Sequence, residues 1–415
     1  MVMLEYNSIM KKIPIGLSDF KELIEQGYYF VDKSLLIEDI LQIGKVALLT
    51  RPRRFGKTLN LSMLRYFFEL SNESNAALFR DLAIFKNQEI WSYQGKFPVI
   101  FISFKSIKES SWSITYEKFE YIIYEEFDRH KYLLEENFLE NYEKELFLKI
   151  LNRKASRAEV DSSLLFLAKL LEKKYKKKVI VLIDEYDVPV QAAYIYGYYS
   201  EAIEFLRALL VSVLKDTVIL EKAVLTGNLT LAKSGLFTGL NNLDIFSVTS
   251  LELSQRFGFT QEEMVELLGH YNLSDYLSLM QRWYDGYTFG NSSCIYNPWS
   301  TLKCIQKKGV FEMYWANTSD NVLLKRLLGR ATKSLKSDLE CILQGNGVKK
   351  TIEDSITFPN LDNNSEILWG LLLYTGYLTY SSYEIKNGKK FCKLKLPNEE
   401  IKQLYGGSKA KTLLQ

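Results

Sequence analysis

A short basic loop that ends in Gly56-Lys57-Thr58 carries the residues with the clearest chemistry in this chain. It follows an apolar run at residues 46–50 and precedes an apolar pattern of helical period at residues 59–70. Backbone amides at such a junction can hold a polyphosphate, Lys57 can reach its outer phosphates, and the Thr58 hydroxyl can ligate Mg²⁺. The pattern G-x-x-x-x-G-K-[ST] has glycine where this chain has Arg51, so an ordinary helix start is the alternative interpretation.

An acidic pair, Asp184-Glu185, follows a second apolar run at residues 179–183. Such an uninterrupted run is typical of a strand that is buried on both faces of a parallel sheet. In P-loop ATPases one carboxylate at the end of this strand holds the Mg²⁺ shell, and a neighbouring one activates water. Acidic residues also follow strands simply because loops are polar. Together with Lys57 and Thr58, the pair predicts that Asp184 binds Mg²⁺ and that Glu185 positions the attacking water.

A third apolar run, residues 223–228, ends in the polar residues Thr226 and Asn228. An ATPase of the additional-strand type would have a γ-phosphate sensor here, and we assign that role to Asn228, with a simple strand end as the alternative. The predicted catalytic residues are therefore Lys57, Glu185 and Asn228, and the predicted Mg²⁺ ligands are Thr58 and Asp184. Nucleotide contacts are expected from the loop and the helix start: Arg53, Arg54, Phe55, Gly56, Lys57, Thr58 and Leu59. Arg53 or Arg54 either adds charge at the phosphates or reaches a neighbouring subunit.

The elements that must position these groups alternate between strands and helices. Strands are expected at residues 46–50, 97–104, 179–183, 223–228 and 246–249, and helices at 59–70, 113–175 and 201–214. This alternation predicts an α/β fold with a mostly parallel sheet, whose ligands lie at the carboxyl ends of the strands. Residues 13–44, which precede the loop, are well placed to cover a nucleotide base.

The sequence pattern changes after residue 250, where helical segments and then a hairpin signal replace the alternation of strands and helices. A capping box at residues 260–263 opens a helix, and residues 322–355 read as helical with an interruption at 345–347. Two alternating segments, 376–386 and 389–396, flank Asn387-Gly388, which is a strong hairpin signal. Helices followed by a hairpin predict a winged-helix-like module, and an isolated packing hairpin is the alternative. The predicted divisions are an ATPase domain at 1–250, a helical or winged-helix-like region at 251–405 and a tail at 406–415.

The composition excludes some classes of protein and leaves others open. A net charge of +3 over 415 residues neither indicates nor excludes a nucleic-acid binder, because charged patches matter more than totals. The lysine-rich stretch at residues 173–178 is interpreted as a solvated helix end. Four dispersed cysteines without C-x-x-C spacing indicate neither a disulfide framework nor a zinc site. With no signal peptide and no membrane-spanning stretch in the sequence, a cytoplasmic protein is expected.

A set of short motifs along the chain is more specific than any one of them. Between about residues 13 and 405 the chain resembles the bacterial AAA-ATPase-like family. The motifs that carry the resemblance are Val31-Asp-Lys-Ser34, Arg51-Pro-Arg-Arg-Phe-Gly-Lys-Thr58, Ile183-Asp-Glu-Tyr-Asp-Val-Pro189, Leu236-Phe-Thr-Gly-Leu-Asn-Asn242, Trp283-Tyr-Asp-Gly-Tyr287, Tyr296-Asn-Pro-Trp-Ser300, Tyr314-Trp-Ala-Asn-Thr-Ser319 and Tyr374-Thr-Gly-Tyr-Leu378.

The resemblance implies a P-loop NTPase core of the additional-strand type, a helical region and a C-terminal PD-(D/E)XK nuclease-like domain. It also implies that an arginine-rich loop without the first glycine is usual, so Arg51 does not argue against phosphate binding. The sequence stops at Gln415, where relatives continue into the nuclease-like part, so that domain is expected to be missing. Relatives often have a basic residue at the positions of Thr230 and Thr288, which argues against a complete set of arginines for hydrolysis.

Two functions of different classes follow. The first is a Mg²⁺-dependent ATPase that couples its nucleotide state to a partner or to a nucleic-acid-related process, with ATP and Mg²⁺ as cofactors. The second is a nucleotide-gated switch or scaffold with little turnover that regulates a separate nuclease-like protein. DNA and a second copy of the chain are further candidate partners. A small-molecule kinase would need a lid and an acceptor pocket, and the sequence shows no sign of either.

Overall fold

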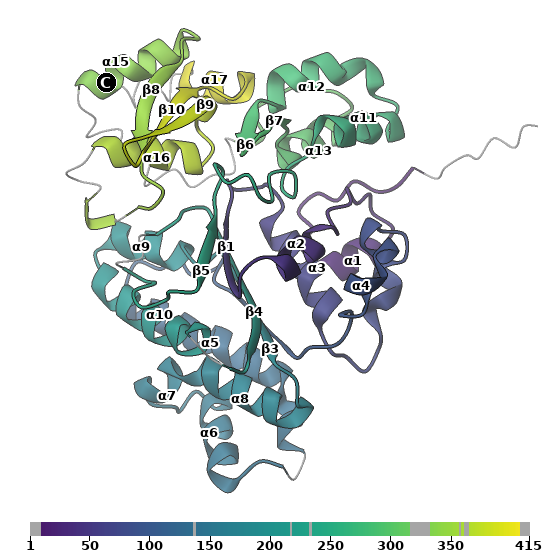
Figure 1. Cartoon of the computed structure of the whole chain (residues 1–415), viewed down its shortest axis with the longest axis vertical. Helices are drawn as coiled ribbons and strands as arrows, with labels where there is room; N and C mark the ends of the chain where they lie inside the picture. Colours follow the sequence, from purple (N-terminus) through teal and green to yellow (C-terminus); the bar gives the residue numbers. More distant parts are fainter. Residues whose placement is uncertain are drawn as a thin grey trace, which may run out of the picture.

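A parallel β-sheet forms the centre of the molecule (Figure 1). The structure is a computed structural model that describes residues 10–135, 138–215, 218–231, 235–315, 333–356, 358–360 and 365–406. The central sheet has five strands in the order β2-β3-β4-β1-β5, and all its pairings are parallel. Its strands are β1 (Val46–Thr50), β2 (Val99–Ser103), β3 (Val179–Asp184), β4 (Leu220–Gly227) and β5 (Leu243–Phe246). The predicted α/β fold with a mostly parallel sheet is confirmed, although β5 ends where the predicted last strand at 246–249 begins.

The strand order determines which loops become neighbours. Every residue of β1 and β3 is buried, as expected for apolar strands with helices on both faces. Strand β4 lies between them, with Leu49 of β1 opposite Thr226 and Ile183 of β3 opposite Leu225. The carboxyl ends of these strands therefore lie side by side at one edge of the sheet.

Helices cover both faces of the sheet (Figure 1). One face carries α1 (Phe20–Glu25), α2 (Leu36–Gln42), α3 (Lys57–Phe68) and the short α4 (Gln88–Trp91). The other carries α5 (Trp112–Arg129), α8 (Ser163–Tyr175), α9 (Val188–Tyr196) and α10 (Tyr199–Leu214), with α6 (Asn141–Leu151) and α7 (Arg157–Asp161) packed on them. The helices expected in residues 59–70, 113–175 and 201–214 are thus present.

Two groups of C-terminal elements gather at one end of the sheet (Figure 1). The first contains α11 (Gln261–His270), α12 (Leu277–Tyr284), α13 (Pro298–Gln306) and the hairpin of β6 (Tyr287–Phe289) and β7 (Ser292–Ile295). Thr260 and Glu263 form the capping box predicted at the start of α11. This group has an apolar core of its own around Met264, Leu267 and Tyr284.

The second group contains an antiparallel three-stranded sheet in the order β8-β10-β9. Its elements are α15 (Lys333–Leu343), β8 (Val348–Ile352), α16 (Ser365–Tyr374), β9 (Thr379–Lys386), β10 (Lys389–Lys395) and α17 (Glu399–Gly406). The predicted hairpin is confirmed, and Asn387 and Gly388 both have the positive φ that a tight hairpin turn needs. The order of helices and strands is compatible with a winged helix, but that assignment stays a prediction, as do the domain limits at 250 and 405.

One element differs from the sequence-based expectation. Residues 348–352, which we interpreted as helical, form β8, because they pair along their whole length with β10, some 40 residues away in the chain. Gly345, with φ of +91°, lies in the turn after α15 and allows the chain to reverse. Residues 322–332 of the same expected helical stretch, and residues 407–415 of the expected tail, lie outside the described residues. Across the described ranges, no helix combines the length and the apolar character needed to cross a membrane.

Strand β2 forms one edge of the central sheet, and a buried carboxylate occupies part of that edge. Glu126 of α5 accepts a hydrogen bond from the Phe101 amide at 3.0 Å, and Arg129 donates both to Glu126 and to the carbonyl oxygen of Val99. Burial by itself would raise the pKa of Glu126, but the charge of Arg129 and hydrogen bonds from His130 and Arg129 outweigh it and lower the pKa to about 2. This cluster holds in place the strand whose last residue, Ser103, contacts Asp184.

We predict that Glu126→Gln lowers the free energy of unfolding at pH 7 by about 3 kcal/mol, because the stabilisation from a lowered carboxyl pKa is present above the unfolded value. The same linkage predicts that this difference shrinks to less than half by pH 3, since the stabilisation disappears as pH falls towards the folded pKa. Urea unfolding of both proteins at the two pH values measures this, with exposed Glu125→Gln on the same helix as control. An equal loss of stability at both pH values would contradict the assigned pKa.

Candidate functional site

The loop between β1 and α3 bends sharply and leaves the start of the helix open. Arg54 has φ of +70° and Gly56 has φ of +87°, and Gly56 is the N-cap of α3. The first hydrogen bond of the helix runs from the Asn60 amide to the carbonyl oxygen of Gly56, at 3.0 Å. The amides of Lys57, Thr58 and Leu59 therefore have no acceptor within the helix. Together with the positive end of the helix dipole, they form a site suited to an anion.

Lys57, Asn228 and Glu185 are joined in one contact network at this position. The buried Lys57 ammonium lies 2.9 Å from Asn228 Oδ1 and 3.5 Å from Glu185 Oε1. It also donates to the loop carbonyl oxygens of Arg51 and Pro52, at 3.1 and 3.2 Å. Asn228 Nδ2 in turn donates to Glu185 Oε2 at 3.1 Å. The three residues predicted to be catalytic, although far apart in sequence, thus lie within direct contact of one another.

Thr58 and Asp184 form a second contact between the loop and β3. Thr58 Oγ1 donates to Asp184 Oδ2 at 3.0 Å, and the Thr226 and Ser103 hydroxyls donate to the same carboxylate at 2.8 and 3.1 Å. Burial, and then the nearby Glu185, raise the pKa of Asp184, while the hydrogen bonds and the charge of Lys57 oppose that rise. The carboxylate is held by neighbours from β2, α3 and β4.

Asp187 is a residue of the site that our sequence analysis did not assign. Its fully buried Oδ2 accepts hydrogen bonds from the amides of Asn228 and Leu229, at 3.1 and 3.0 Å. Burial, and then the charge of Glu185, raise its pKa to about 6. A Cβ on Gly227 would lie 2.6 Å from the Tyr186 ring and 2.8 Å from Asp187 Oδ1, so only glycine fits there. Asp187 therefore fixes the chain that carries Asn228.

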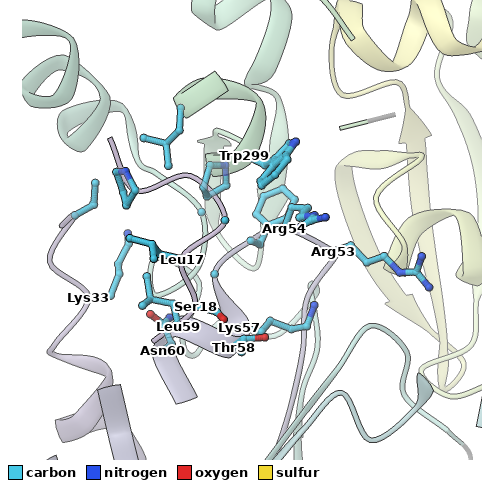
Figure 2. A pocket seen from close by; sticks show the side chains of 18 of the residues that line it. Leu17, Ser18, Lys33, Arg53, Arg54, Lys57, Thr58, Leu59, Asn60 and Trp299 are labelled. Carbon is cyan, nitrogen blue, oxygen red and sulfur yellow. The ribbon is translucent and has the colours of Figure 1, made fainter. Parts of the chain in front are cut away.

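A cavity of about 290 Å³ opens over the loop. All seven residues predicted to contact the nucleotide line it, as does Glu185. In Figure 2, Lys57 and Thr58 lie at its base, Leu17, Ser18 and Lys33 lie on one side, and Trp299 of α13 lies above them. Much of the remaining lining is apolar: Pro14, Tyr29, Phe30, Val31, Phe259, Pro298 and Leu302. The segment expected to cover a base does line this cavity.

The predicted contact residues differ in where their side chains point. The Arg54 guanidinium stacks over the Trp299 ring, 4.2 Å from its centre, and Arg53 extends away from Lys57 (Figure 2). The Phe55 side chain is buried against Tyr287 and Phe289. The side chains of Lys57 and Thr58 contact the acidic pair directly, and Arg54 interacts with Glu185 through its charge. The contribution of Arg53 and Phe55 to the cavity therefore comes mainly from the main chain.

Arg51, at the position where the phosphate-loop pattern has glycine, points into the protein. Its fully buried guanidinium donates to the carbonyl oxygens of Thr50, Phe246 and Leu253, at 2.8, 2.9 and 3.2 Å. Its faces lie over Phe257 and Phe289, and no carboxylate of the described chain pairs with it. Burial lowers the pKa of Arg51 to about 9. The side chain thus connects the loop to the end of β5 and to the segment after it.

Other cations supply positive charge around the cavity. Lys105 and Lys108, from the loop after β2, line the cavity, as does Arg256, which pairs with Asp39 at 2.5 Å. No motif in the sequence distinguished the two lysines or Arg256, because each is a single cation in an ordinary loop.

The two threonines at positions where relatives often have a basic residue do not line the cavity. Thr230 is buried with its hydroxyl 3.2 Å from that of Thr50, and Thr288 donates its amide to Thr379.

The available donors fit a magnesium ion that arrives with phosphates. The Thr58 hydroxyl and the Asp184 carboxylate supply oxygen ligands, which Mg²⁺ prefers. Within the part of the chain that the structure describes, no group of three or more His, Cys, Asp or Glu side chains could hold a metal ion. Mg²⁺ commonly takes one or two protein oxygens and completes its shell with phosphates and water. The residues fit that arrangement and not a metal site made of protein ligands alone.

Comparison with known proteins agrees with this geometry. The family model described as Predicted AAA-ATPase matches residues 14–237, which is more than half of the chain. A relative from Azotobacter chroococcum mcd 1, described as an uncharacterized protein in the vnfD 5' region, is 28% identical over 394 residues. The alignment covers 94% of this chain and 68% of that protein. The matched region contains the loop, the acidic pair and Asn228, and the chain belongs to the family of predicted AAA-ATPases.

Proposed function

We propose that this protein binds ATP with Mg²⁺ in the cavity over the loop and hydrolyses it to ADP and phosphate. The observation that carries the proposal is the convergence of Lys57 and Thr58 with Glu185, Asp184 and Asn228 from two neighbouring strands. In phosphoryl transfer the protein acts mainly by positioning and by stabilising charge, and this arrangement offers both.

Each residue has a role that follows from its contacts. Lys57 and the first amides of α3 hold the β- and γ-phosphates, while Thr58 and Asp184 would hold Mg²⁺, which neutralises phosphate charge when bound. Glu185 orients the attacking water and accepts its proton. Asn228, which contacts both Lys57 and Glu185, positions Glu185 relative to the γ-phosphate. Glu185 has φ of +53°, a left-handed conformation that is strained for a non-glycine residue and that is often found at functional sites.

The apolar part of the cavity is proposed to take the nucleotide base. Phe30, Phe259 and Pro298 supply flat apolar surface beside the loop, and Trp299 with its stacked Arg54 forms the rim. Such a pocket has room for a planar ring, while the cationic end at Lys57 takes the phosphates. The Arg54 guanidinium stacks on Trp299 and interacts electrostatically with Glu185, so its charge would add to that of Lys57 when a phosphate enters the cavity.

A second candidate function, a nucleotide-gated switch, is favoured by contacts between the loop and the C-terminal elements. A Cβ on Gly376 would lie 2.9 Å from Pro52, and Trp315 Nε1 donates to the Arg53 carbonyl oxygen at 3.1 Å. The Trp315 amide donates to the buried Glu400 of α17 at 2.6 Å. A change in the loop on nucleotide binding would therefore act directly on the C-terminal elements, and through them on a partner such as a separate nuclease-like protein, DNA or a second copy of the chain.

The rate of ATP hydrolysis distinguishes the ATPase from the nucleotide-gated switch. Calorimetry that shows tight ATP binding together with negligible phosphate release would favour the switch. Steady release of phosphate, with free phosphate as the only phosphorylated product besides ADP, would favour the ATPase and dismiss a kinase.

We predict that Lys57→Ala weakens ATP binding by roughly 30- to 150-fold, because a charge-assisted contact to phosphate is worth roughly 2–3 kcal/mol. Isothermal titration calorimetry of the wild type and the variant measures the change. Lys96→Ala, at an exposed position, is the matched control and should bind as the wild type does. Unchanged affinity in Lys57→Ala would remove Lys57 from the phosphate site.

Glu185→Gln is expected to keep ATP affinity within a few-fold and to reduce phosphate release by about 100-fold or more, since general-base catalysis typically contributes that much. The amide preserves the shape of the side chain and its contact with Asn228, but cannot accept the proton. Phosphate release under saturating ATP is the measurement. Equal hydrolysis by the two proteins would show that Glu185 does not have this role.

Trp315→Phe is expected to weaken ATP binding by roughly three- to tenfold, because the loop loses one hydrogen bond worth about 1 kcal/mol while the ring is largely kept. Trp283→Phe, which leaves the loop contacts intact, serves as control. Calorimetry gives the affinities and thermal unfolding verifies that both variants are folded. If the two variants bind ATP equally well, the Trp315 contact does not support the loop.

A further inference from the structure

The three-stranded sheet presents one face to solvent, and that face is basic. Side chains alternate between the faces of a strand, and residues directly opposite in neighbouring strands share a face. Lys393 of β10 is opposite Lys349 of β8 and Ser382 of β9, Phe391 is opposite Thr351 and Glu384, and Lys389 is opposite Lys386. We call the surface formed by Lys349, Lys386, Lys389, Phe391 and Lys393 the lysine face.

The other side of the same sheet belongs to the protein core. Ile352, Tyr380, Cys392 and Leu394 are buried there, and the sheet contacts α15 and α16. From Ile367 to Tyr374, α16 is buried along its length, so this helix cannot enter a groove of a nucleic acid. The lysine face is the surface that this module leaves open.

The lysines of the face are exposed, and one carboxylate, that of Glu384, lies among them. Lys349 pairs with Glu384, which is itself on the face, at 2.5 Å. Among the described residues no carboxylate lies within ion-pair distance of Lys386, Lys389 or Lys393. In the stretch at 173–178, Lys173 pairs with Glu143 and Lys178 with Glu221. On the lysine face Glu384 compensates the charge of Lys349, and the other three lysines have no ion-pair partner among the described residues.

Placing these lysines opposite one another lowers the stability of the three-stranded sheet, and packing of the apolar core does not require it. Like charges directly opposite in a sheet are destabilising, and both Lys349–Lys393 and Lys386–Lys389 are such pairs. The stem of Lys393 lies across Gly347, where a Cβ would be 2.7 Å from the lysine Cε. Phe391 is half-buried among the lysines, and within the described ranges it belongs to neither of the two main apolar cores. The Lys349 ammonium lies over its ring, 5.4 Å from the centroid.

We infer that the lysine face binds single-stranded nucleic acid. Lys386, Lys389 and Lys393 would contact phosphates, and an unpaired base would stack on Phe391, with Lys349 moving aside to a neighbouring phosphate. An aromatic ring within a basic surface is the combination by which proteins bind single strands without sequence preference. A duplex keeps its bases stacked and would use the lysines alone, and an acidic peptide would have no use for the ring. This surface is separate from the cavity over the loop, so the inference does not depend on ATP hydrolysis.

The test measures fluorescence anisotropy of labelled 20-nucleotide oligo-dT and oligo-U, and of a 20-base-pair duplex, with the full chain at two salt concentrations. We expect both single strands to bind more tightly than the duplex. The Lys389→Glu/Lys393→Glu double variant should lose at least tenfold in affinity and show a weaker salt dependence. Phe391→Leu should lose about five- to tenfold with an unchanged salt dependence. Lys176→Glu/Lys177→Glu, at the exposed end of α8, is the matched charge control and should bind as the wild type does.

Several outcomes would overturn the inference. Absence of binding at low salt would do so, as would an equal loss of affinity in the Lys176/Lys177 control. Tighter binding to the duplex, together with no effect of Phe391→Leu, would show that no base stacks on the ring. Full competition by polyglutamate at equal charge concentration would assign the face to acidic peptides instead. Circular dichroism and thermal unfolding of each variant verify that a loss of binding is not a loss of fold.

Discussion

A lysine ammonium buried at the carboxyl edge of a parallel sheet is the constraint on which the rest of this structure depends. Lys57 is almost completely buried, and a buried charge is costly unless it is paired and hydrogen-bonded. Glu185, Asn228 and the loop carbonyl oxygens supply those partners, and each must come from a specific place in the chain. The sheet places β4 between β1 and β3, and this order brings these segments together at one edge. The sheet that forms the centre of the fold therefore also supplies the partners that the buried Lys57 charge requires.

A second buried cation, Arg51, connects the loop to the segment that leads to the C-terminal elements. Arg51 leaves the loop and binds carbonyl oxygens at the end of β5 and at Leu253, so the loop cannot change shape without affecting the segment after the sheet. Gly376 and Trp315 reach the same loop from the other side. Trp315 donates to the main chain of the loop, and the backbone of Gly376 passes so close to Pro52 that a Cβ would not fit. The loop is thus packed between the sheet and the C-terminal elements, which makes it a suitable place for a nucleotide to control both.

Sequence patterns predicted the central strands and the hairpin turn, because these depend mainly on residues that are adjacent in the chain. Apolar runs at β1, β3 and β4 are typical of strands buried in a parallel sheet, and Asn387-Gly388 specifies a tight turn by its backbone preferences. Strand β8 was missed, because the sequence Val-Lys-Lys-Thr-Ile has no strong local preference and takes its conformation from pairing with the distant β10. Asp187, Trp299 and Lys105 were missed for a related reason. Their roles come from contacts across the fold, and no spacing in the sequence reveals them.

The most direct measurement is a crystal structure of the protein with Mg²⁺ and a non-hydrolysable ATP analogue. The account predicts phosphates between Lys57 Nζ and the first amides of α3, the metal bound by Thr58 on the side of Asp184, and the base against Phe30 and Phe259. An analogue bound elsewhere, or phosphates in the cavity that contact neither Lys57 nor the start of α3, would contradict it.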